Sequence, residues 1–140
     1  MKINAILATK GMNVVTIRPE QSVREAIAIL SKHNIGVLVV VNASAGVVGI
    51  LSERDVVRRA AHNEHIFDRA VSELMTKKVI TGSPGDDLDP VLKTMTEKHF
   101  RHLPIVENDK LVGIVTLGDM VKARLDQYRG EIDTLQTQIS

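Results

Sequence analysis

Hydrophobic and polar positions follow the same order twice along this chain. Each copy has a short β-branched run, apolar residues at helical spacing, two apolar runs separated by a polar turn, and a second helical segment. The first copy predicts strands and helices over residues 14–17, from Ser22 onward, 37–41, 47–51 and 54–61. The second copy repeats this plan over residues 79–81, from Asp87 onward, 103–106 and 111–115.

Caps and turns support these boundaries. Ser22 and Glu25 form the capping-box pattern ahead of an apolar helical face. Asn34 stands where a left-handed residue would end that helix. Polar turns at residues 42–46 and at Asn108-Asp109 separate the last two strands of each copy. Short amphipathic segments at residues 3–7 and 71–75 precede the two copies and match each other.

The copies align at a constant offset until the first polar turn, where the first copy has an extra residue. Identical pairs are Thr16 with Thr81, Pro19 with Pro84, Val41 with Val106, Gly49 with Gly113, Ile50 with Ile114, and Asp55 with Asp119. A repeated unit usually cannot bury its apolar face alone. We therefore expect an α+β fold of tandem βαββα repeats with pseudo-twofold symmetry, divided at residues 1–75 and 76–140. A ligand groove would then occur twice, at the seam between the repeats.

The C-terminal segment departs from the repeat. Its apolar residues alternate in steps of four and three at Val121, Leu125, Tyr128, Ile132, Leu135 and Ile139, which is the a/d spacing of a coiled coil. The stripe could pack on the chain's own body, but the body has its full set of elements before residue 125. We therefore expect an extended C-terminal helix that meets a partner helix. Apolar helical faces also point to a homodimer, and they are predicted from Val56, Val57, Met120 and Val121.

Composition narrows the function classes. The net charge is +1, so no bulk field draws the chain to nucleic acid or to a membrane. Two phenylalanines and one tyrosine offer few stacking platforms for single-stranded nucleic acid. The absence of cysteine excludes disulfides and thiolate sites. No signal-peptide pattern is present, and the apolar run 37–41 is too short to cross a bilayer. We expect a cytoplasmic protein without nucleic-acid or membrane partners.

A matched motif ends the last strand of each copy: Gly49-Ile-Leu-Ser-Glu-Arg-Asp55 and Gly113-Ile-Val-Thr-Leu-Gly-Asp119. The hydroxyl of Ser52 or Thr116 stands at a helix entrance, where unpaired N–H groups favour an anion. The aspartate three residues later has two acceptor oxygens that suit the vicinal hydroxyls of a ribose. Alternatively, the hydroxyls are N-caps and the aspartates stabilise the helix dipole. The doubling at matched spacing favours a nucleotide.

The whole pattern resembles a cystathionine-beta-synthase (CBS) domain pair, also called a Bateman module. The resemblance covers nearly the whole chain and rests on the repeat, on the Gly-x-x-Ser/Thr-x-x-Asp motif in both copies, and on Arg101-His-Leu-Pro-Ile-Val106. It implies a regulatory, non-catalytic module with two clefts for adenine nucleotides. AMP, ADP or ATP would be the ligands, with NAD(H) or S-adenosylmethionine as alternatives, and an unidentified protein would be regulated.

In that family each cleft takes its ribose and phosphate ligands from one repeat and much of its adenine pocket from the other. One cleft would use Thr116 and Asp119, with Arg101 and His102 near phosphate, and the adenine would lie against Val14, Val15, Thr16, Ile35, Gly36, Val37 and Leu38. The other would use Ser52, Arg54 and Asp55, with the base near Val79, Ile80, Phe100 and Leu103. Gly36 and Val37 stand where the second repeat has Arg101 and His102, so the Ser52 cleft should lack that cation pair. Either Arg54 substitutes for the pair, or this cleft prefers a ligand with less phosphate charge.

Other chemistries have less support. His62 with His65, and His99 with His102, have no third ligand nearby in the sequence, whereas zinc sites usually have three or four. We therefore expect no metal. A nucleotide-acting enzyme would need a general base or a nucleophile beside its carboxylates, and none accompanies them. The other alternative is an interaction module whose clefts are vestigial and whose C-terminal heptads mediate dimerisation.

Overall fold

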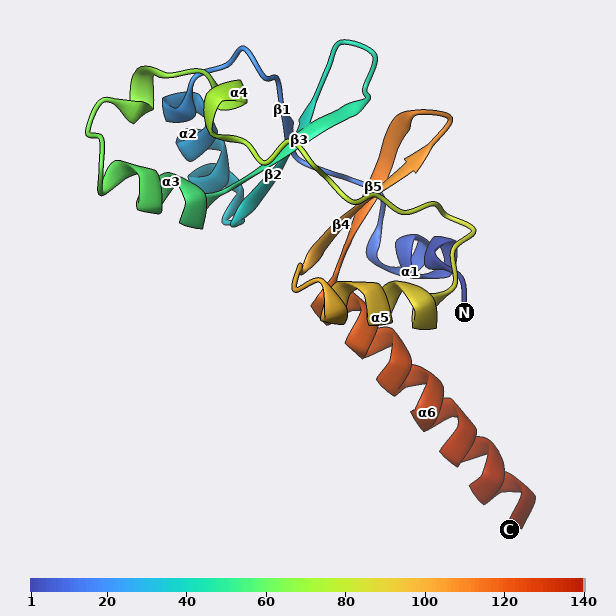
Figure 1. Cartoon of the computed structure of the whole chain (residues 1–140). Helices are drawn as coiled ribbons and strands as arrows, with labels where there is room; N and C mark the ends of the chain where they lie inside the picture. The colour runs from blue at the N-terminus through green and yellow to red at the C-terminus, as the bar shows by residue number, and fades with distance from the viewer. Residues whose placement is uncertain (140) are drawn as a thin grey trace.

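The computed structural model describes residues 1–139, and the side chains of residues 1–137. The chain forms two lobes, and a long helix projects from the second (Figure 1). The first lobe contains β1 (Thr16–Ile17), α2 (Val23–His33), β2 (Val37–Val41), β3 (Val47–Ser52), α3 (Glu53–Ala60), a 3₁₀ turn (Ile66–Asp68) and α4 (Val71–Leu74). The second contains α1 (Ile3–Lys10), α5 (Leu88–Glu97), β4 (His102–Glu107), β5 (Lys110–Thr116) and α6 (Leu117–Ile139). The predicted α+β fold of tandem repeats with a C-terminal helix is confirmed.

Each lobe has its own small sheet. In the first lobe β1 pairs parallel with β2, and β2 pairs antiparallel with β3. In the second lobe β4 pairs antiparallel with β5.

The predicted strand over residues 79–81 is wrong. These residues form no strand in the described chain, and a single parallel bridge joins Gly82 to Ile105. Gly82 stands where the first repeat has Ile17, and glycine weakens a strand because it has no side chain to pack. Neighbouring side chains fill the space instead, since a Cβ on Gly82 would lie 2.9 Å from Cδ2 of Leu103.

The local capping signals are largely confirmed. The Ser22 hydroxyl accepts a hydrogen bond from the N–H of Glu25 at 3.1 Å, and Asn34 ends α2 with φ 51°. Asp87 stands at the N-cap of α5 but makes no side-chain cap bond there. Its carboxylate instead forms an ion pair with Lys2, with 2.9 Å between Nζ and Oδ1.

The helix that precedes each repeat packs on the other repeat. Ile3, Ile6 and Leu7 of α1 are buried in the core of the second lobe. Val71 and Leu74 of α4 are buried in the core of the first lobe. The division at residues 1–75 and 76–140 therefore separates the repeats in sequence, but the packing crosses it. This exchange ties the lobes together, because burying one aliphatic side chain contributes about 1.5–3 kcal/mol.

The glycine of the repeated motif makes room for this exchange. A Cβ on Gly49 would lie 2.5 Å from Sδ of Met75, and a Cβ on Gly113 would lie 2.7 Å from Cδ2 of Leu7. Leu7 and Met75 are equivalent positions of the segments 3–7 and 71–75. The two glycines therefore leave room for side chains of the chain itself.

Two of the predicted outer-face residues are buried. Val56 is 2% exposed and Met120 is 0% exposed, so their assignment to outer apolar faces is wrong. Successive helical residues point about 100° apart, and the neighbours Val57 and Val121 are 67% and 44% exposed.

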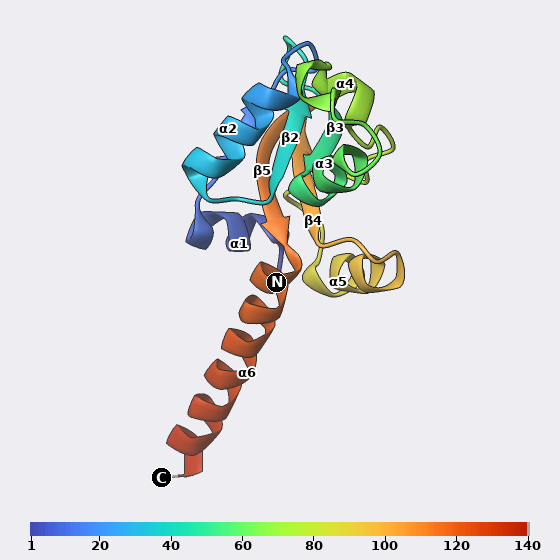
Figure 2. The ribbon, with the colours of Figure 1, turned by 90° about the vertical axis from the view of Figure 1, so that its left-hand side faces the viewer.

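The second repeat's last helix and the predicted tail helix are one continuous helix, α6, which extends away from the body in both ribbon views (Figures 1 and 2). Arg124 ties its base to α5 through an ion pair with Asp89. The predicted stripe is exposed at Val121, Leu125, Tyr128, Ile132 and Leu135. The side chain of Ile139 lies outside the described residues. None of the described helices has both the length and the apolar character needed to cross a membrane.

Candidate functional site

Both repeated motifs place their hydroxyl at a helix start. Ser52 precedes α3, and its Oγ accepts from the N–H of Asp55 at 3.1 Å. Thr116 precedes α6, and its Oγ1 accepts from the N–H of Asp119 at 3.0 Å. Both hydroxyls therefore serve as N-caps, which leaves the aspartate carboxylates as the groups that can distinguish the two motifs.

Each helix start is also tied to the residue before the preceding antiparallel pair. The N–H of Glu53 donates to the carbonyl of Gly36 at 2.9 Å, and the N–H of Leu117 donates to the carbonyl of Arg101 at 2.8 Å. These equivalent bonds hold Gly36 and Arg101 at the two helix entrances. The start of α6 therefore has a cationic residue, Arg101, beside it, whereas the equivalent residue at the start of α3 is Gly36, which has no side chain.

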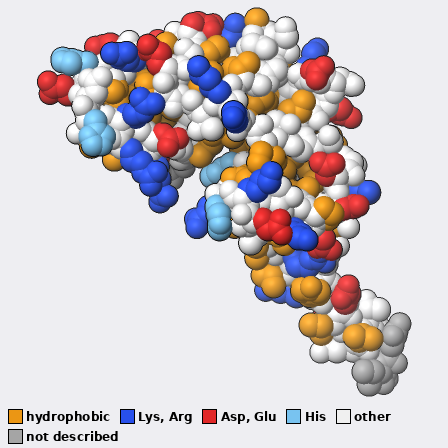
Figure 3. Space-filling view, in the orientation of Figure 1, with side chains coloured by type: hydrophobic (Ala, Val, Ile, Leu, Met, Phe, Trp, Pro, Cys, Tyr) orange, Lys and Arg blue, Asp and Glu red, His pale blue; other side chains and the backbone are white. Residues whose placement is uncertain are grey.

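A cavity of about 1090 Å³, the central cavity, lies between the lobes. The hollow between the lobes is visible at the surface, with Lys and Arg side chains at its rim (Figure 3). Its wall combines the start of α3 with the end of α5 and the start of β4. It is lined by Gly36, Val37, Ile50, Ser52, Glu53, Arg54, Asp55, Thr76, Lys78, Val79, Ile80, Met95, Thr96, Lys98, His99, Phe100, Arg101, His102 and Leu117. The volume suffices for a nucleotide-sized ligand.

Basic side chains dominate this wall. Arg54, Lys78, Lys98 and Arg101 face two acidic residues, Glu53 and Asp55. None of the four cations forms an ion pair with another described residue. The cavity therefore offers an anion several uncompensated positive charges, beside an apolar strip at Val79, Ile80 and Phe100.

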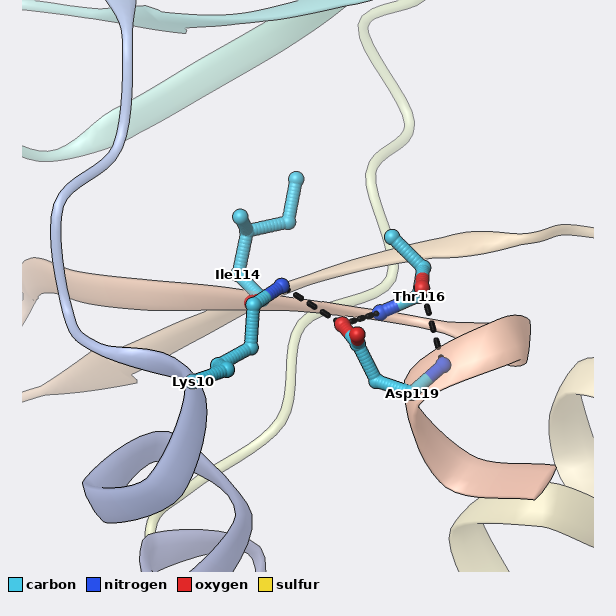
Figure 4. A network of polar contacts seen from close by, with 4 residues as sticks. All are labelled: Lys10, Ile114, Thr116 and Asp119. Carbon is cyan, nitrogen blue, oxygen red and sulfur yellow. Dashed lines mark hydrogen bonds and ion pairs between the residues drawn. The ribbon is translucent and has the colours of Figure 1, made fainter. Parts of the chain in front are cut away.

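The carboxylates of the two motifs have different surroundings. Among the described residues, the Asp55 carboxylate makes no hydrogen bond or ion pair. Asp119 Oδ2 accepts from the Thr116 N–H at 2.8 Å and lies 2.5 Å from Nζ of Lys10 (Figure 4). Nζ of Lys10 also donates to the carbonyl oxygen of Ile114 at 2.9 Å. Asp55 is thus available to a ligand, whereas Asp119 is engaged by the chain.

Electrostatics at Asp119 follow from this geometry. Burial alone would raise the pKa of the Asp119 carboxyl, but hydrogen bonds from Lys10 and Thr116, with the Lys10 charge, lower the pKa below its ordinary value of 3.8. The Lys10 and Asp119 side chains are 28% and 26% exposed. The pair is therefore ionised and partly shielded from water at neutral pH.

His102 lines the central cavity and is within electrostatic reach of Lys10 and Asp119. Burial, followed by the positive charges of Lys10 and Arg101, lowers the pKa of His102 below its ordinary value of 6.5. The imidazole is therefore neutral at pH 7, so the phosphate contact predicted for it would be that of a neutral donor unless an anion raises its pKa.

The central cavity brings together most residues predicted for the Ser52 cleft. Ser52, Arg54, Asp55, Val79, Ile80 and Phe100 line it. Gly36, Val37, Arg101 and His102, which were predicted for the other cleft, line it as well. Arg101 and His102 thus stand on the same wall as Ser52, although they were expected at the other cleft.

The remaining predicted residues lie elsewhere. Thr116 lines a second cavity of about 610 Å³, the tail cavity, together with Arg101, His102 and the first turns of α6. Leu103 lines a smaller cavity behind Ile80 and Phe100. The central and tail cavities include none of the others: Val14, Val15, Thr16, Ile35, Leu38 and Asp119. Leu38 is fully buried in the first core, and Val15 and Ile35 pack against that core.

Sequence reasoning missed three lysines, Lys10, Lys78 and Lys98. The sequence does contain a signal for Lys10 and Lys78, because they occupy matching positions after the two equivalent segments. Lys10 follows Leu7 by three residues, and Lys78 follows Met75 by three. No comparable signal marks Lys98, which reaches the cavity from the end of α5. As for metals, a search of the described residues finds no group of three or more His, Cys, Asp or Glu side chains that could hold an ion.

Comparison with known proteins places this geometry in a family. The family model of the CBS domain matches residues 5–62 and 71–126. The chain is 32% identical over 118 residues to the CBS domain-containing protein YhcV of Bacillus subtilis, covering 84% of both chains. It matches the crystal structure of the CBS-domain protein ATU1752 from Agrobacterium tumefaciens with a TM-score of 0.81 and 39% identity, covering 89% of this chain and 99% of that one.

A further match is to a structure that contains ligands. The CBS domain pair of protein MJ0100, in complex with 5′-methylthioadenosine and S-adenosyl-L-methionine, aligns with a TM-score of 0.77 and 28% identity. The alignment covers 91% of this chain and 98% of that one. With two family matches that span most of its length, one for each repeat, this chain belongs to the CBS-domain family.

Proposed function

We propose that this chain is a regulatory module that binds an adenosine phosphate in the central cavity and has no catalytic activity. The observation that carries the proposal is the combination of an unengaged carboxylate, Asp55, with the capped helix start at Ser52 and several unpaired cations on one wall. The MJ0100 pair in complex with two adenosine-containing molecules supports the choice of adenosine.

Different groups of lining residues would bind the ribose, the phosphate and the adenine of the ligand. Asp55 would accept hydrogen bonds from the two ribose hydroxyls, since a carboxylate has acceptor sites on both oxygens. Lys78 and Arg101 would contact phosphate oxygens, near the positive end of α3. The adenine would lie against the apolar strip at Val79, Ile80 and Phe100.

Charge selects among adenosine ligands. The excess of basic over acidic side chains on the wall favours AMP, ADP, ATP or NAD(H), which carry phosphate. It disfavours S-adenosylmethionine, whose sulfonium group is positive. We therefore expect phosphorylated ligands to bind more tightly than adenosine, 5′-methylthioadenosine or S-adenosylmethionine.

Calorimetric titration of the intact chain with AMP, ADP, ATP, NAD⁺, S-adenosylmethionine, adenosine and GTP tests the proposal. Saturable binding of adenosine phosphates, weaker binding of GTP and no conversion of the bound nucleotide are expected. A chain that binds no adenosine phosphate at millimolar concentration, or that prefers GTP, would refute the assignment. Turnover of the nucleotide would favour an enzyme, and full dimerisation without any ligand binding would favour an interaction module.

The proposal includes a homodimer joined at α6. The helix has 23 residues and extends away from the body (Figure 2). Its apolar stripe is exposed at Val121, Leu125, Tyr128, Ile132 and Leu135. A second copy of α6 would cover this stripe at a/d spacing, at a cost of about 1 kcal/mol for Gly130 within the helix. Sedimentation of the intact chain and of a truncation after Gln127 tests it: the intact chain should dimerise and the truncation should not. A monomeric intact chain at micromolar concentration contradicts the dimer.

The regulated partner and a cytoplasmic location complete the proposal. Adenosine phosphates are cytoplasmic metabolites, so a module that senses them would act there on a protein outside this chain. Such regulation requires that the nucleotide bind one arrangement of the assembly more tightly than another.

A further inference from the structure

Lys10 holds the position at Asp119 that a ligand's hydroxyls would need. Its Nζ lies 2.5 Å from Oδ2 of Asp119 and 2.9 Å from the carbonyl oxygen of Ile114. The same Oδ2 already accepts from the N–H of Thr116. A diol that approached this carboxylate would therefore have to replace a bond between two opposite charges by bonds from uncharged hydroxyls, and would leave the ammonium with the Ile114 carbonyl as its remaining partner.

The rest of α1 fixes this lysine in place. Ile3, Leu7 and Lys10 follow at helical spacing and share one face of the helix. Ile3 is fully buried, and Leu7 packs against Gly113, one residue before Ile114. The N–H groups of Ile3 and Asn4 donate to the carbonyls of Asp86 and Pro84 at 2.9 Å each. The ammonium thus projects from a helix that is held by its N-terminal hydrogen bonds and by its buried apolar face.

Lys78, the equivalent lysine in the segment that packs on the first lobe, is not held in this way. Beyond Leu7 the helix α1 continues to Lys10, so three residues advance by about 4.5 Å. Beyond Leu74 the chain leaves α4, and Thr76 pairs with the backbone of Ile50 at 3.0 and 2.8 Å. Three extended residues span about 10 Å, and Lys78 accordingly lies on the wall of the central cavity without an ion pair.

We infer that Lys10 is an internal ligand of Asp119 that closes the second-repeat site, so that each chain takes one nucleotide, at Asp55. The inference rests on the proposed function and adds a determinant of which site is used. Thr116 lines the tail cavity, but Asp119 lines neither that cavity nor the central one, and its carboxylate meets the Lys10 ammonium instead. Ligand entry there requires displacement of Lys10.

Stoichiometry tests this inference. The intact chain is titrated calorimetrically with AMP, alongside Lys10→Met, which removes the charge at similar length, and Lys10→Arg, which keeps a cation. Lys2→Met is the matched control, because Lys2 precedes the same helix and pairs with Asp87 instead. We expect one site per chain in the wild type, in Lys10→Arg and in Lys2→Met, and two sites in Lys10→Met. If the wild type has a second site, its affinity for AMP should be at least about tenfold weaker than that of the second site in Lys10→Met.

Two follow-up variants identify the sites. In Lys10→Met, adding Asp119→Ala should remove the gained site, and adding Asp55→Ala should remove the original one. Two equivalent sites in the wild type, or one site in Lys10→Met with an unchanged amide NMR spectrum elsewhere, would overturn the inference while the proposed function stands. Absence of AMP binding in every chain would instead refute the proposed function, and with it this inference.

Discussion

Equivalent backbone carbonyls of the two lobes, those of Ile50 and Ile114, accept hydrogen bonds from different groups. In the first lobe, the carbonyl of Ile50 accepts from the N–H of Thr76 at 2.8 Å, and the nearby Asp55 carboxylate is left without a partner among the described residues. In the second lobe, the carbonyl of Ile114 accepts from Nζ of Lys10, which also binds Asp119. The two matched motifs therefore differ in which polar groups are left without a partner, because a different segment packs on each lobe. The motif alone does not define a site.

The segment of α1 should contribute more to the free energy of unfolding than the equivalent segment of α4. Leu7→Ala tests this and should have the largest effect of the variants considered. Leu7 is 2% exposed and packs in the second core, so its truncation should lower the free energy of unfolding by about 2–5 kcal/mol. Met75→Ala is the matched variant at the equivalent position. It should cost less, because Met75 is only partly buried. Urea unfolding measures both, and a larger loss for Met75→Ala would contradict the comparison.

Asp55 and Asp119 should differ sharply in nucleotide binding. Asp55→Ala removes the acceptor of the ribose hydroxyls in the central cavity and should weaken AMP binding by about 1–3 kcal/mol, which is roughly 5–150-fold. Asp119→Ala should leave the affinity of that site within about twofold, because Asp119 does not line the central cavity and changes at separate sites are usually independent. Calorimetry measures both changes. A greater loss in Asp119→Ala than in Asp55→Ala would reverse the assignment of the open and closed sites.

The Arg101 side chain should contribute to the binding of ligands that carry a phosphate and not to the binding of adenosine. Its guanidinium lines both the central and the tail cavity, and its removal deletes charge-assisted contacts while leaving the adenosine pocket intact. Arg101→Ala should weaken AMP by about 1 kcal/mol, roughly fivefold, because the residue is exposed. Adenosine binding should not change. Equal losses for AMP and adenosine would show that the arginine side chain has a structural role and makes no phosphate contact.

The Lys10–Asp119 pair should contribute a small, pH-dependent stability. Because the folded-state pKa of Asp119 is lowered, the contribution is full above the unfolded-state pKa of about 3.8 and is lost as the pH falls through the folded-state value. Lys10→Met should therefore cost about 0.5–1 kcal/mol between pH 5 and 8. The difference from wild type should shrink below about pH 4. A difference that persists unchanged at pH 2 would point to lost packing of the lysine stem.

The same variant has an independent reporter at His102. The charge of Lys10 helps to lower the pKa of His102, so the pKa measured by NMR should rise in Lys10→Met. It should not move in Lys2→Met, whose charge pairs with Asp87. An unchanged His102 pKa would show that the Lys10 ammonium lies elsewhere in solution.

Much of the fold could be predicted because the repeated signals are local. Ser22, Asn34 and the Asn108-Asp109 turn act through their own backbone, and each has the predicted role or a positive φ in the structure. The strand at residues 79–81 failed because Gly82 has no side chain to pack, and Asp87 lost its cap bond to Lys2 across a long sequence distance. Long-range partners of this kind leave no trace in a local pattern.

The site was predictable in its residue types and less so in their grouping. Ser52, Asp55, Ile80 and Phe100 lie on one cavity, as the resemblance implied. The sequence could not show that Arg101 and His102 would reach the same cavity, because this depends on how the two lobes meet. Nor could it show that Lys10 would engage Asp119, because that contact joins residues 109 positions apart.

The most direct test of the account is a crystal structure of the intact chain grown with a slight excess of AMP over protein. The account predicts one nucleotide in the central cavity, with its ribose hydroxyls on Asp55, its phosphate beside Lys78 and Arg101, and Lys10 still bound to Asp119. A nucleotide whose ribose lies on Asp119, with Lys10 displaced and Asp55 empty, would contradict it.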